Sequence, residues 1–316
     1  MKLLVTGGAG YIGAVVAAQL LAAGHEVVVL DDLSTGHRDG VPDGASFVRG
    51  HLRDAGDVLD QSFDGVLHFA AKAQVAESVE HPDLYWDNNV VGTLALLAPM
   101  RDVGVQRLVF SSTAATYGVP ERVPIREDDP TAPINPYGQS KLAVDMAMSG
   151  WASAYGLAAV SLRYFNVGGA FGRLGERHDP ETHLIPNVLQ VAAGRRDAVD
   201  IFGTDYDTRD GTCVRDYLHV VDLGQAHLLA LEGAAPGEHR IYNLGTGTGY
   251  TVREVVDACR RVTGSSMPTT DRPRRPGDPP ALVASAERIG ADLGWKPALD
   301  LDRIVADAWA FAQARG

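Results

Sequence analysis

The sequence predicts an α/β fold in which a doubly wound parallel sheet is followed by a smaller mixed α/β unit. Three observations predict it: strands and helices alternate through the first half, glycines join the first strand to the first helix, and an acidic residue ends the second strand. This is the Rossmann arrangement. The 316 residues suffice for two domains. We expect the first over residues 1–165 and the second over 166–316, with elements of about 215–245 packing back on the first.

Composition excludes several classes of protein. Hydrophobic residues make up 45% and charged residues 22%, and no apolar run is long enough to cross a membrane. The net charge of −12 disfavours a general binder of nucleic-acid backbones, which needs a basic face. The first residues already form a strand, which leaves no room for a signal peptide, and Cys213 and Cys259 lack metal-binding spacings. We therefore expect a cytoplasmic protein that binds neither nucleic acid nor membrane.

The first helix and the turn before it predict a dinucleotide site. Lys2–Thr6 is a buried strand, and Gly7, Gly10 and Gly13 lead from it into a helix over Tyr11–Ala23. The first glycine permits a sharp turn, the second lets backbone amides approach a pyrophosphate, and the third lets the helix pack on the strand. The N-terminus of the helix then faces the anion.

The second strand indicates which dinucleotide binds. Glu26–Leu30 is apolar and ends in Asp31 and Asp32. Asp31 follows Gly7 at close to the roughly 20-residue offset at which a carboxylate meets the adenosine ribose 2′-hydroxyl. A carboxylate there repels a 2′-phosphate, so we expect NAD rather than NADP as the cofactor.

The rest of the first half continues the alternation. Pro82 and Gly104 bound the longest of these helices, and Gly/Pro-rich loops cover Ser34–Gly44 and Pro120–Pro136. We expect strands at Ala45–Arg49, Gly65–Phe69, Gln106–Phe110 and Ala158–Arg163, and helices at Asp54–Gln61, Asp83–Val103 and Tyr137–Tyr155.

Beyond Asn166 the regular alternation fails, and a glycine-rich, charged stretch marks the change of domain. Asp271–Pro280 is rich in Pro and Arg and is expected to be irregular. Further helices are expected at Leu184–Ala193, Asp222–Leu231, Thr251–Thr263, Ala286–Leu293 and Leu301–Ala314, and strands at Val199–Phe202 and Ile241–Leu244.

Tyr137 and Lys141 form the leading catalytic pair. Residues four apart on a helix share a face, so the two side chains project together. An ammonium one turn away favours the phenolate of a tyrosine, which can then exchange a proton with an alcohol. The hydroxyls of Ser111 and Thr113 follow a strand at the same expected sheet edge, where Ala70 and Ala71 admit a ligand close to the backbone.

Together these residues resemble the extended short-chain dehydrogenase/reductase superfamily. Within it the chain is similar, essentially from end to end, to the UDP-glucose 4-epimerases, also called UDP-galactose 4-epimerases. The more specific matches are Arg163-Tyr-Phe-Asn166, Gly194-Arg-Arg-Asp197, Ile201-Phe-Gly203, Asp210-Gly-Thr-Cys-Val-Arg-Asp-Tyr217 and Arg274-Arg-Pro-Gly-Asp278.

The resemblance implies a reaction at C4 of a UDP-hexose. Tyr137 would remove the proton of the 4-hydroxyl while the C4 hydride moves to NAD, which gives a transient 4-keto sugar that turns over and is reduced on its other face. Thr113 would hydrogen-bond the 4-oxygen, and Lys141 would hold Tyr137 ionised. Thr113 stands where the family usually has serine, and the hydroxyl is kept.

The resemblance also implies the binding residues. Those for NAD are Gly7, Gly10, Tyr11, Ile12, Gly13, Asp31, Asp32, Leu52, Phe69, Ala70, Ala71, Asn88, Ser111, Tyr137, Lys141, Tyr164 and Phe165. Those for the UDP-sugar are Thr113, Asn166, His183, Leu184, Phe202, Arg215, Arg275, Asp278 and Leu282. Arg215 and Arg275 suit diphosphate oxygens because guanidinium groups donate paired hydrogen bonds.

Two positions depart from the family pattern, and a third position bears on substrate specificity. His51 replaces the Asp that usually meets the adenine, and Lys72 lies one place before a family lysine that touches NAD. Leu282 stands where residues of varied size limit the pocket beside the sugar C2 group. A leucine there leaves N-acetylhexosamines open as substrates.

The rival functions are a 4-epimerase of another UDP-sugar (an N-acetylhexosamine, glucuronate or pentose), a nucleotide-sugar 4,6-dehydratase, and a non-catalytic NAD-binding sensor. The dehydratase needs an Asp-Glu pair after the strand-end threonine, where this chain has Ala114 and Ala115. A sensor has no need of a poised tyrosine.

We expect no metal, because the ten histidines, His178 and His183 included, show no zinc-type spacing. By resemblance, Asp83–Val103 and Tyr137–Tyr155 would pair with a second subunit as a homodimer.

Overall fold

The computed structural model describes residues 1–275 and 277–315, and its centre is a seven-stranded sheet of order β13-β6-β5-β4-β1-β2-β3. All neighbouring strands in it run parallel, which confirms the predicted fold class. Its strands are β1 (Lys2–Thr6), β2 (Glu26–Asp31), β3 (Ser46–Arg49), β4 (Gly65–His68), β5 (Arg107–Thr113), β6 (Ala158–Tyr164) and β13 (His239–Leu244).

The strand order reverses beside β1. The chain runs outward from β1 through β2 to β3, and then crosses back to place β4 on the other side of β1. In doubly wound sheets a ligand crevice opens at this point, beyond the carboxyl ends of the strands. The glycines after β1 and the alanines after β4 therefore border the same crevice.

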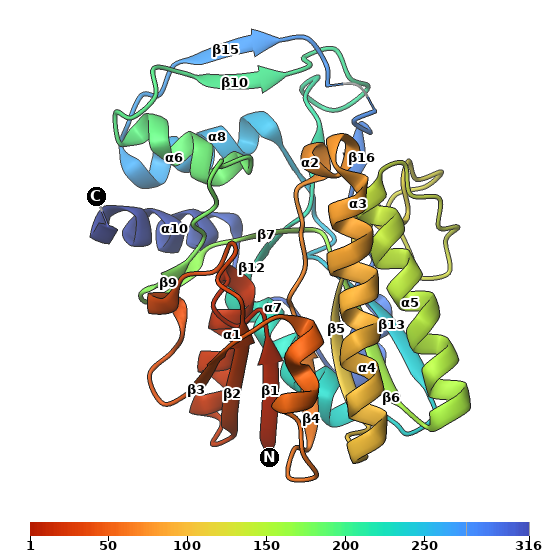
Figure 1. Ribbon diagram of the computed structural model, residues 1–316. Coiled ribbons are helices and arrows are strands. Elements are labelled where there is room, and N and C mark those ends of the chain that lie inside the picture. The colour runs from red at the N-terminus through yellow and green to blue at the C-terminus, as the bar shows by residue number, and fades with distance from the viewer. Residues whose placement is uncertain (276, 316) are drawn as a thin grey trace.

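Helices cover both faces of the sheet, because alternate residues of its buried strands point to opposite sides (Figure 1). Leu3 and Val5 of β1 pack in one core with α1 (Tyr11–Ala22) and α7 (Val220–Gly233). Leu4 packs in a second core with α4 (Gly92–Val103) and α5 (Pro136–Tyr155).

The expected helix over Asp83–Val103 is present but not uniform. It begins as α3 (Pro82–Tyr85), continues as a π-helical stretch over Trp86–Val91 and ends as α4. Gly104, at φ +81°, ends it as predicted. The short α2 (Val75–Glu80) precedes it. A π-helical stretch changes which residues face inward, and it is often found at functional sites.

Apart from α7 and β13, which pack on or complete the sheet, most of the second half forms a smaller layer above the carboxyl edge of the sheet (Figure 1). Its core joins α6 (Leu184–Ala192), α8 (Val252–Thr263) and α10 (Leu301–Arg315). α9 (Glu287–Leu293) completes the helices, and the remaining strands are β7 (Asn166–Gly168), β8 (Ala170–Phe171), β9 (Leu174–Gly175), β10 (Val199–Phe202), β11 (Val214–Arg215), β12 (Tyr217–His219), β14 (Tyr250–Thr251), β15 (Thr269–Arg272) and β16 (Ala281–Leu282).

Two local expectations differ from the structure. The helix expected at Asp54–Gln61 is a 3₁₀ helix over Leu52–Asp57, where His51 and Asp54 bond reciprocally across its first turn. The stretch expected to be irregular, Asp271–Pro280, begins inside β15, which gains backbone partners from β10. Residue 276 lies outside the described residues. Within those residues, each helix is too short or too polar to span a membrane.

Candidate active site

The glycine turn is as tight as its sequence predicts. Gly7 has φ +71°, and a Cβ there would lie 2.5 Å from the Ala70 backbone nitrogen. A Cβ on Gly13 would lie 2.3 Å from the Gly7 carbonyl oxygen, so the first turn of α1 packs directly on the loop. The N-cap residue of α1 is Gly10, which has no side chain to bond the first amides of the helix. The first amides of the helix are thus free of side-chain caps, as a pyrophosphate requires.

Asp31 is fixed to this turn at the end of β2. Its carboxylate accepts hydrogen bonds from the backbone nitrogens of Ala9 at 3.0 Å and Leu33 at 2.8 Å. Burial raises the pKa of Asp31, while these two bonds lower it. Asp32 lies 3.1 Å from the Nδ1 of His51, so the histidine that departs from the family pattern pairs with an acidic residue of the predicted NAD site.

Asn89 holds the loop after β4 to the candidate catalytic helix. Its amide accepts from the Lys72 nitrogen at 2.8 Å, and donates to the Lys72 oxygen at 3.0 Å and the Ser140 hydroxyl at 3.0 Å. Asn89 is buried, whereas the predicted Asn88 is partly exposed and bonds to Asn89. Asn88 stays a prediction for NAD binding, and Asn89 is an additional structural residue for which the sequence signal was an asparagine pair at the centre of a long helix.

The structure brings Thr113, Tyr137 and Lys141 together. Asn135 caps α5 by accepting from the Gly138 nitrogen at 2.8 Å. A Cβ on Gly138 would lie 2.5 Å from the Ala115 oxygen, so the first turn of α5 packs against the residues that follow β5. This close approach places Tyr137 beside Thr113, whose hydroxyl lowers the pKa of the Tyr137 phenol.

Lys141 lies one turn further along α5 and is 2% exposed. Its Nζ donates to the Ser111 carbonyl at 2.7 Å and lies 4.7 Å from the centre of the Phe110 ring. Tyr164, at the end of β6, is opposite Thr113 in the strand register. The carboxyl ends of β5 and β6 therefore lie beside Tyr137 and Lys141.

Burial dominates the electrostatics of this pair. It raises the pKa of Tyr137, which the Thr113 hydroxyl partly offsets. It lowers the pKa of Lys141 to about 7, although Asp145 acts in the opposite direction. Both shifts favour the neutral forms, because a charge loses hydration when it is buried. A phenolate at Tyr137 therefore needs more positive charge than the buried lysine alone provides.

The predicted substrate residues form a second group on the smaller layer. Arg215 forms an ion pair with Asp278, and it is opposite Leu282 in the register of β11 and β16. The Arg275 guanidinium lies 4.1 Å from the centre of the Phe202 ring. Arg274 faces another way, with its Nε 2.7 Å from Asp205.

Phe165 and Leu282 connect the two groups. Both pack against a buried cluster formed by Ala114, Tyr117 and Ile125, directly after Thr113. On the opposite side, the Tyr11 hydroxyl donates to the Gly169 oxygen at 2.6 Å, three residues after Asn166. Phe69 packs against the His227 ring at 4.8 Å, and Leu52 is buried in the second core.

His183 stands at the N-cap of α6, and Leu184 begins that helix. Its Nδ1 lies 2.8 Å from Glu176 and 2.9 Å from Glu181. Burial lowers the pKa of His183, but these two carboxylates raise it to about 10.

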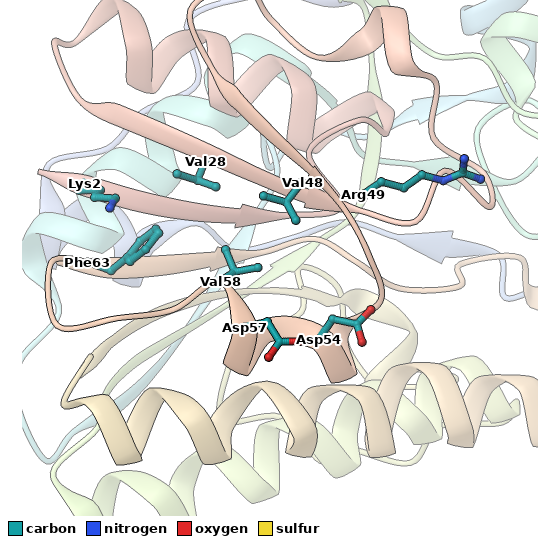
Figure 2. Close-up of a pocket in the computed structure, with 8 residues that line it drawn as sticks. All are labelled: Lys2, Val28, Val48, Arg49, Asp54, Asp57, Val58 and Phe63. Carbon is teal, nitrogen blue, oxygen red and sulfur yellow. The ribbon is translucent and has the colours of Figure 1, made fainter.

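A separate hollow of about 470 Å³ lies on the sheet beside the 3₁₀ helix Leu52–Asp57 (Figure 2). Its lining residues are Lys2, Val28, Val48, Arg49, Asp54, Asp57, Val58 and Phe63. This lining includes none of the predicted site residues, so the hollow is distinct from the crevice that Tyr137 borders.

The model of the NAD dependent epimerase/dehydratase family matches residues 3–245. The chain belongs to this family. It is 60% identical to the UDP-glucose 4-epimerase of Streptomyces lividans, over 98% of this chain and 95% of the relative. It is 56% identical to that of Corynebacterium glutamicum, over 100% and 97%.

Among solved structures, this epimerase/dehydratase family member is similar to the UDP-glucose 4-epimerase of Brucella ovis in complex with NAD. The TM-score is 0.94 and the sequence identity 47%, over 98% of each chain. The family match spans the glycine turn, the Tyr137–Lys141 pair and β13, and the likeness to full relatives extends it over the second half.

Proposed function

We propose that this chain is a UDP-glucose 4-epimerase, an isomerase that interconverts UDP-glucose and UDP-galactose with NAD. The observation that carries the proposal is that Tyr137 and Lys141 lie on the first turns of α5, packed against the residues that follow Thr113 at the carboxyl edge of the sheet, which the glycine turn also borders. A hydroxyl relay at that edge suits proton exchange with a sugar alcohol. The sequence of this chain is also 60% identical to that of a relative named UDP-glucose 4-epimerase.

The residues present fit NAD. Gly7 and Gly13 leave room that a Cβ would fill, α1 offers uncapped amides, and the Asp31 carboxylate ends β2 beside the turn. These groups would hold the pyrophosphate and the adenosine ribose. When bound, NAD supplies a hydride acceptor and donor next to the sugar C4, and the positive charge of its nicotinamide.

The chain's own residues move the proton. Tyr137 takes it from the 4-hydroxyl as the C4 hydride leaves, and returns it after the 4-keto sugar has turned over. Thr113, beside Tyr137, would hold the 4-oxygen and pass the proton. Lys141, held to the Ser111 carbonyl, stabilises the phenolate whenever it is protonated. No second substrate is consumed, because the hydride and the proton both return.

The second group of residues would tether the nucleotide while the sugar turns. Arg215 and Arg275 carry the charge for the diphosphate, Asp278 suits the uridine ribose, and Asn166 and Phe202 lie on strands beside them. Arg215 and Asp278 form an ion pair. The substrate diphosphate would compete with Asp278 for the donors of Arg215.

Leu282 carries the second candidate, a 4-epimerase that also accepts N-acetylhexosamines. It is partly exposed and packs with Phe165 beside the residues that follow Thr113. A leucine leaves more room beside the sugar C2 group than a tyrosine would. Turnover of UDP-GlcNAc or UDP-GalNAc tests this extension, and absence of both products would exclude it.

The assembly we propose is a homodimer formed through the helices around α4 and α5. Val79, Trp86, Val91, Leu94 and Met146 expose between 37% and 70% of their surface along these helices. Apolar side chains gathered in this way favour a protein interface.

We also propose a reducing, cytoplasmic location, in line with the buried free thiols of Cys213 and Cys259. The domain boundary near residue 165 remains our proposal for where the substrate-binding part begins.

The deciding experiment is product analysis with UDP-galactose and no added electron acceptor. We expect UDP-glucose to accumulate, and Tyr137→Phe to reduce kcat by at least about 100-fold, the usual contribution of a general acid–base group. Tyr155→Phe is the matched control, because Tyr155 lies at the other end of α5 and is half exposed. Wild-type turnover in Tyr137→Phe would refute the proton-transfer role.

A further inference from the structure

Four side chains with metal-ligand atoms converge between β9 and α6, outside the residues assigned to proton transfer. They are Glu176, His178, Glu181 and His183, and we call them the 176–183 cluster. One ligand atom from each lies within 4.8 Å of the other three. Glu176 Oε1 is 3.1 Å from the Nδ1 of His178 and 2.8 Å from that of His183.

The folded segment, rather than its spacing, creates the cluster. Glu-x-His-x-x-Glu-x-His is not a zinc-type spacing, and the sequence analysis expected no metal. In the structure Arg177 faces away, with its guanidinium 3.0 Å from Asp39. His183 is at the same time fixed as the N-cap of α6. Because Arg177 and His183 are both held in place, the segment between them folds so that the four side chains of the cluster converge.

We propose that the 176–183 cluster binds one divalent transition-metal ion, of which zinc is the best fit. Two imidazole nitrogens with two carboxylate oxygens form a donor set that zinc accepts, and the mixture is less suited to calcium or magnesium. In a tetrahedral zinc site, bonds of about 2.0–2.2 Å place the ligand atoms roughly 3.3–3.6 Å apart. Three Glu–His pairs are 2.8–3.1 Å apart and all four ligand atoms lie within 4.8 Å of one another, so metal binding requires some pairs to open and others to close.

Burial and charge support a dication here. The side chains of Glu176 and Glu181 are each 9% exposed, so two negative charges lie close together with little water around them. Among the described residues, their ion-pair partners are the histidines of the same cluster. Buried carboxylates need compensation by a cation, and one divalent ion compensates both while leaving the imidazoles neutral.

The site would fix the orientation of His183. Its Nδ1 faces the cluster, so a metal bound there leaves the proton on Nε2, which becomes a donor of fixed position. The two carboxylates also act electrostatically on Tyr11, at the start of α1. A metal would thus join the N-terminus of α6 to the region of the glycine turn. This role acts on a residue that the resemblance assigns to the UDP-sugar, whereas metal binding itself is measured independently of the epimerase proposal.

Metal binding to the untagged full-length chain tests the inference. The chain is stripped with a chelator, and zinc is then titrated in competition with a chromogenic chelator; cobalt(II) replaces it for visible spectroscopy. We expect about one zinc per chain and cobalt bands of tetrahedral nitrogen and oxygen coordination. His178→Ala and Glu181→Gln should weaken binding at least about tenfold, as removing support from a metal site does. His25→Ala is the control, because His25 lies at the opposite edge of the sheet, where its Nδ1 is 3.3 Å from the Met1 amino group.

Circular dichroism shows that each variant is folded before its affinity is read. Substoichiometric zinc in the folded wild type would overturn the inference, and a proton on His183 would then be the cation of the cluster. Equal affinities in all variants would overturn it too. Turnover of UDP-galactose is measured on the same samples: inactive protein that binds zinc refutes the proposed function alone, and active protein without zinc refutes the metal site alone.

Discussion

The Asp145 carboxylate lies 3.0 Å from the Arg163 guanidinium, and each side chain is 3% exposed. Asp145 follows Lys141 by one turn of α5, and Arg163 belongs to β6. Ser112 of β5 also donates to this carboxylate, at 3.3 Å. The ion pair therefore joins the helix that carries the candidate proton-transfer residues to the strands that end beside them.

Asp145→Asn should lower the free energy of unfolding by about 3–5 kcal/mol, because it leaves the Arg163 charge buried and unpaired. Urea unfolding measures the loss. The matched control is Asp102→Asn, whose carboxylate is 62% exposed and 2.7 Å from Arg101. An exposed pair contributes at most about 1 kcal/mol. Equal losses in the two variants would contradict a stabilising role for the buried pair of Asp145 with Arg163.

The stability of the cofactor-free protein should depend on pH through Lys141. The pKa of Lys141 is about 7 in the folded chain, against about 10.4 for an unperturbed lysine. Between these values the unfolded state binds more protons, so stability rises with pH by up to about 1.4 kcal/mol per unit. Lys141→Met should remove this part of the slope.

The measurement is the free energy of unfolding in urea at several pH values from 7 to 10. Lys296→Met is the control, because it removes an exposed lysine. Parallel pH profiles for wild type and Lys141→Met would show that the Lys141 ammonium survives burial.

Gly13→Ala should abolish retention of NAD through gel filtration. The added methyl would lie 2.3 Å from the Gly7 carbonyl oxygen, so the glycine turn or α1 must move. Gly150→Ala is a matched control in the exposed face of α5, where a Cβ meets nothing within 4 Å. It should keep NAD and gain up to about 1 kcal/mol of stability from helix propensity. Normal NAD content in Gly13→Ala would mean that the turn tolerates a side chain.

Arg275→Ala should raise the KM for UDP-galactose by roughly 10- to 100-fold with little change in kcat, since a lost hydrogen bond to a charged group costs about 1.5–3 kcal/mol. Its neighbour Arg274 offers the comparison, because its guanidinium is already paired with Asp205. Steady-state kinetics of the two variants should separate them. If Arg274→Ala has the larger effect on KM, the two roles are reversed.

Much of the fold and of the candidate site follows from local sequence. The apolar run Lys2–Thr6, the glycines after it and the acid at Asp31 predict a strand, a turn and a ligand edge, because each depends on neighbouring residues. The spacing of Tyr137 and Lys141 likewise places both on one face of α5. For these positions the local pattern is enough.

The rest depends on contacts between distant segments. Asn89 supports the loop at Lys72 because the helix is π-helical there, and hydrophobic periodicity does not reveal which of two adjacent asparagines turns inward. The pair of Asp145 with Arg163 joins a helix to a strand that follows it. The pKa of Lys141 is set mainly by burial, and the spacing between Lys141 and Tyr137 in the sequence does not predict how buried the lysine is.

The place of β13 bears on how the chain can be synthesised and cut. This strand completes the sheet beside β6, although residues 165–238, much of them in the smaller layer, lie between the two strands in sequence. A fragment that stopped near residue 165 would leave the backbone of β6 unpaired along one side, ready to associate with other chains. On the ribosome, the nucleotide-binding half must likewise wait for residues 239–244 to emerge before its sheet is closed.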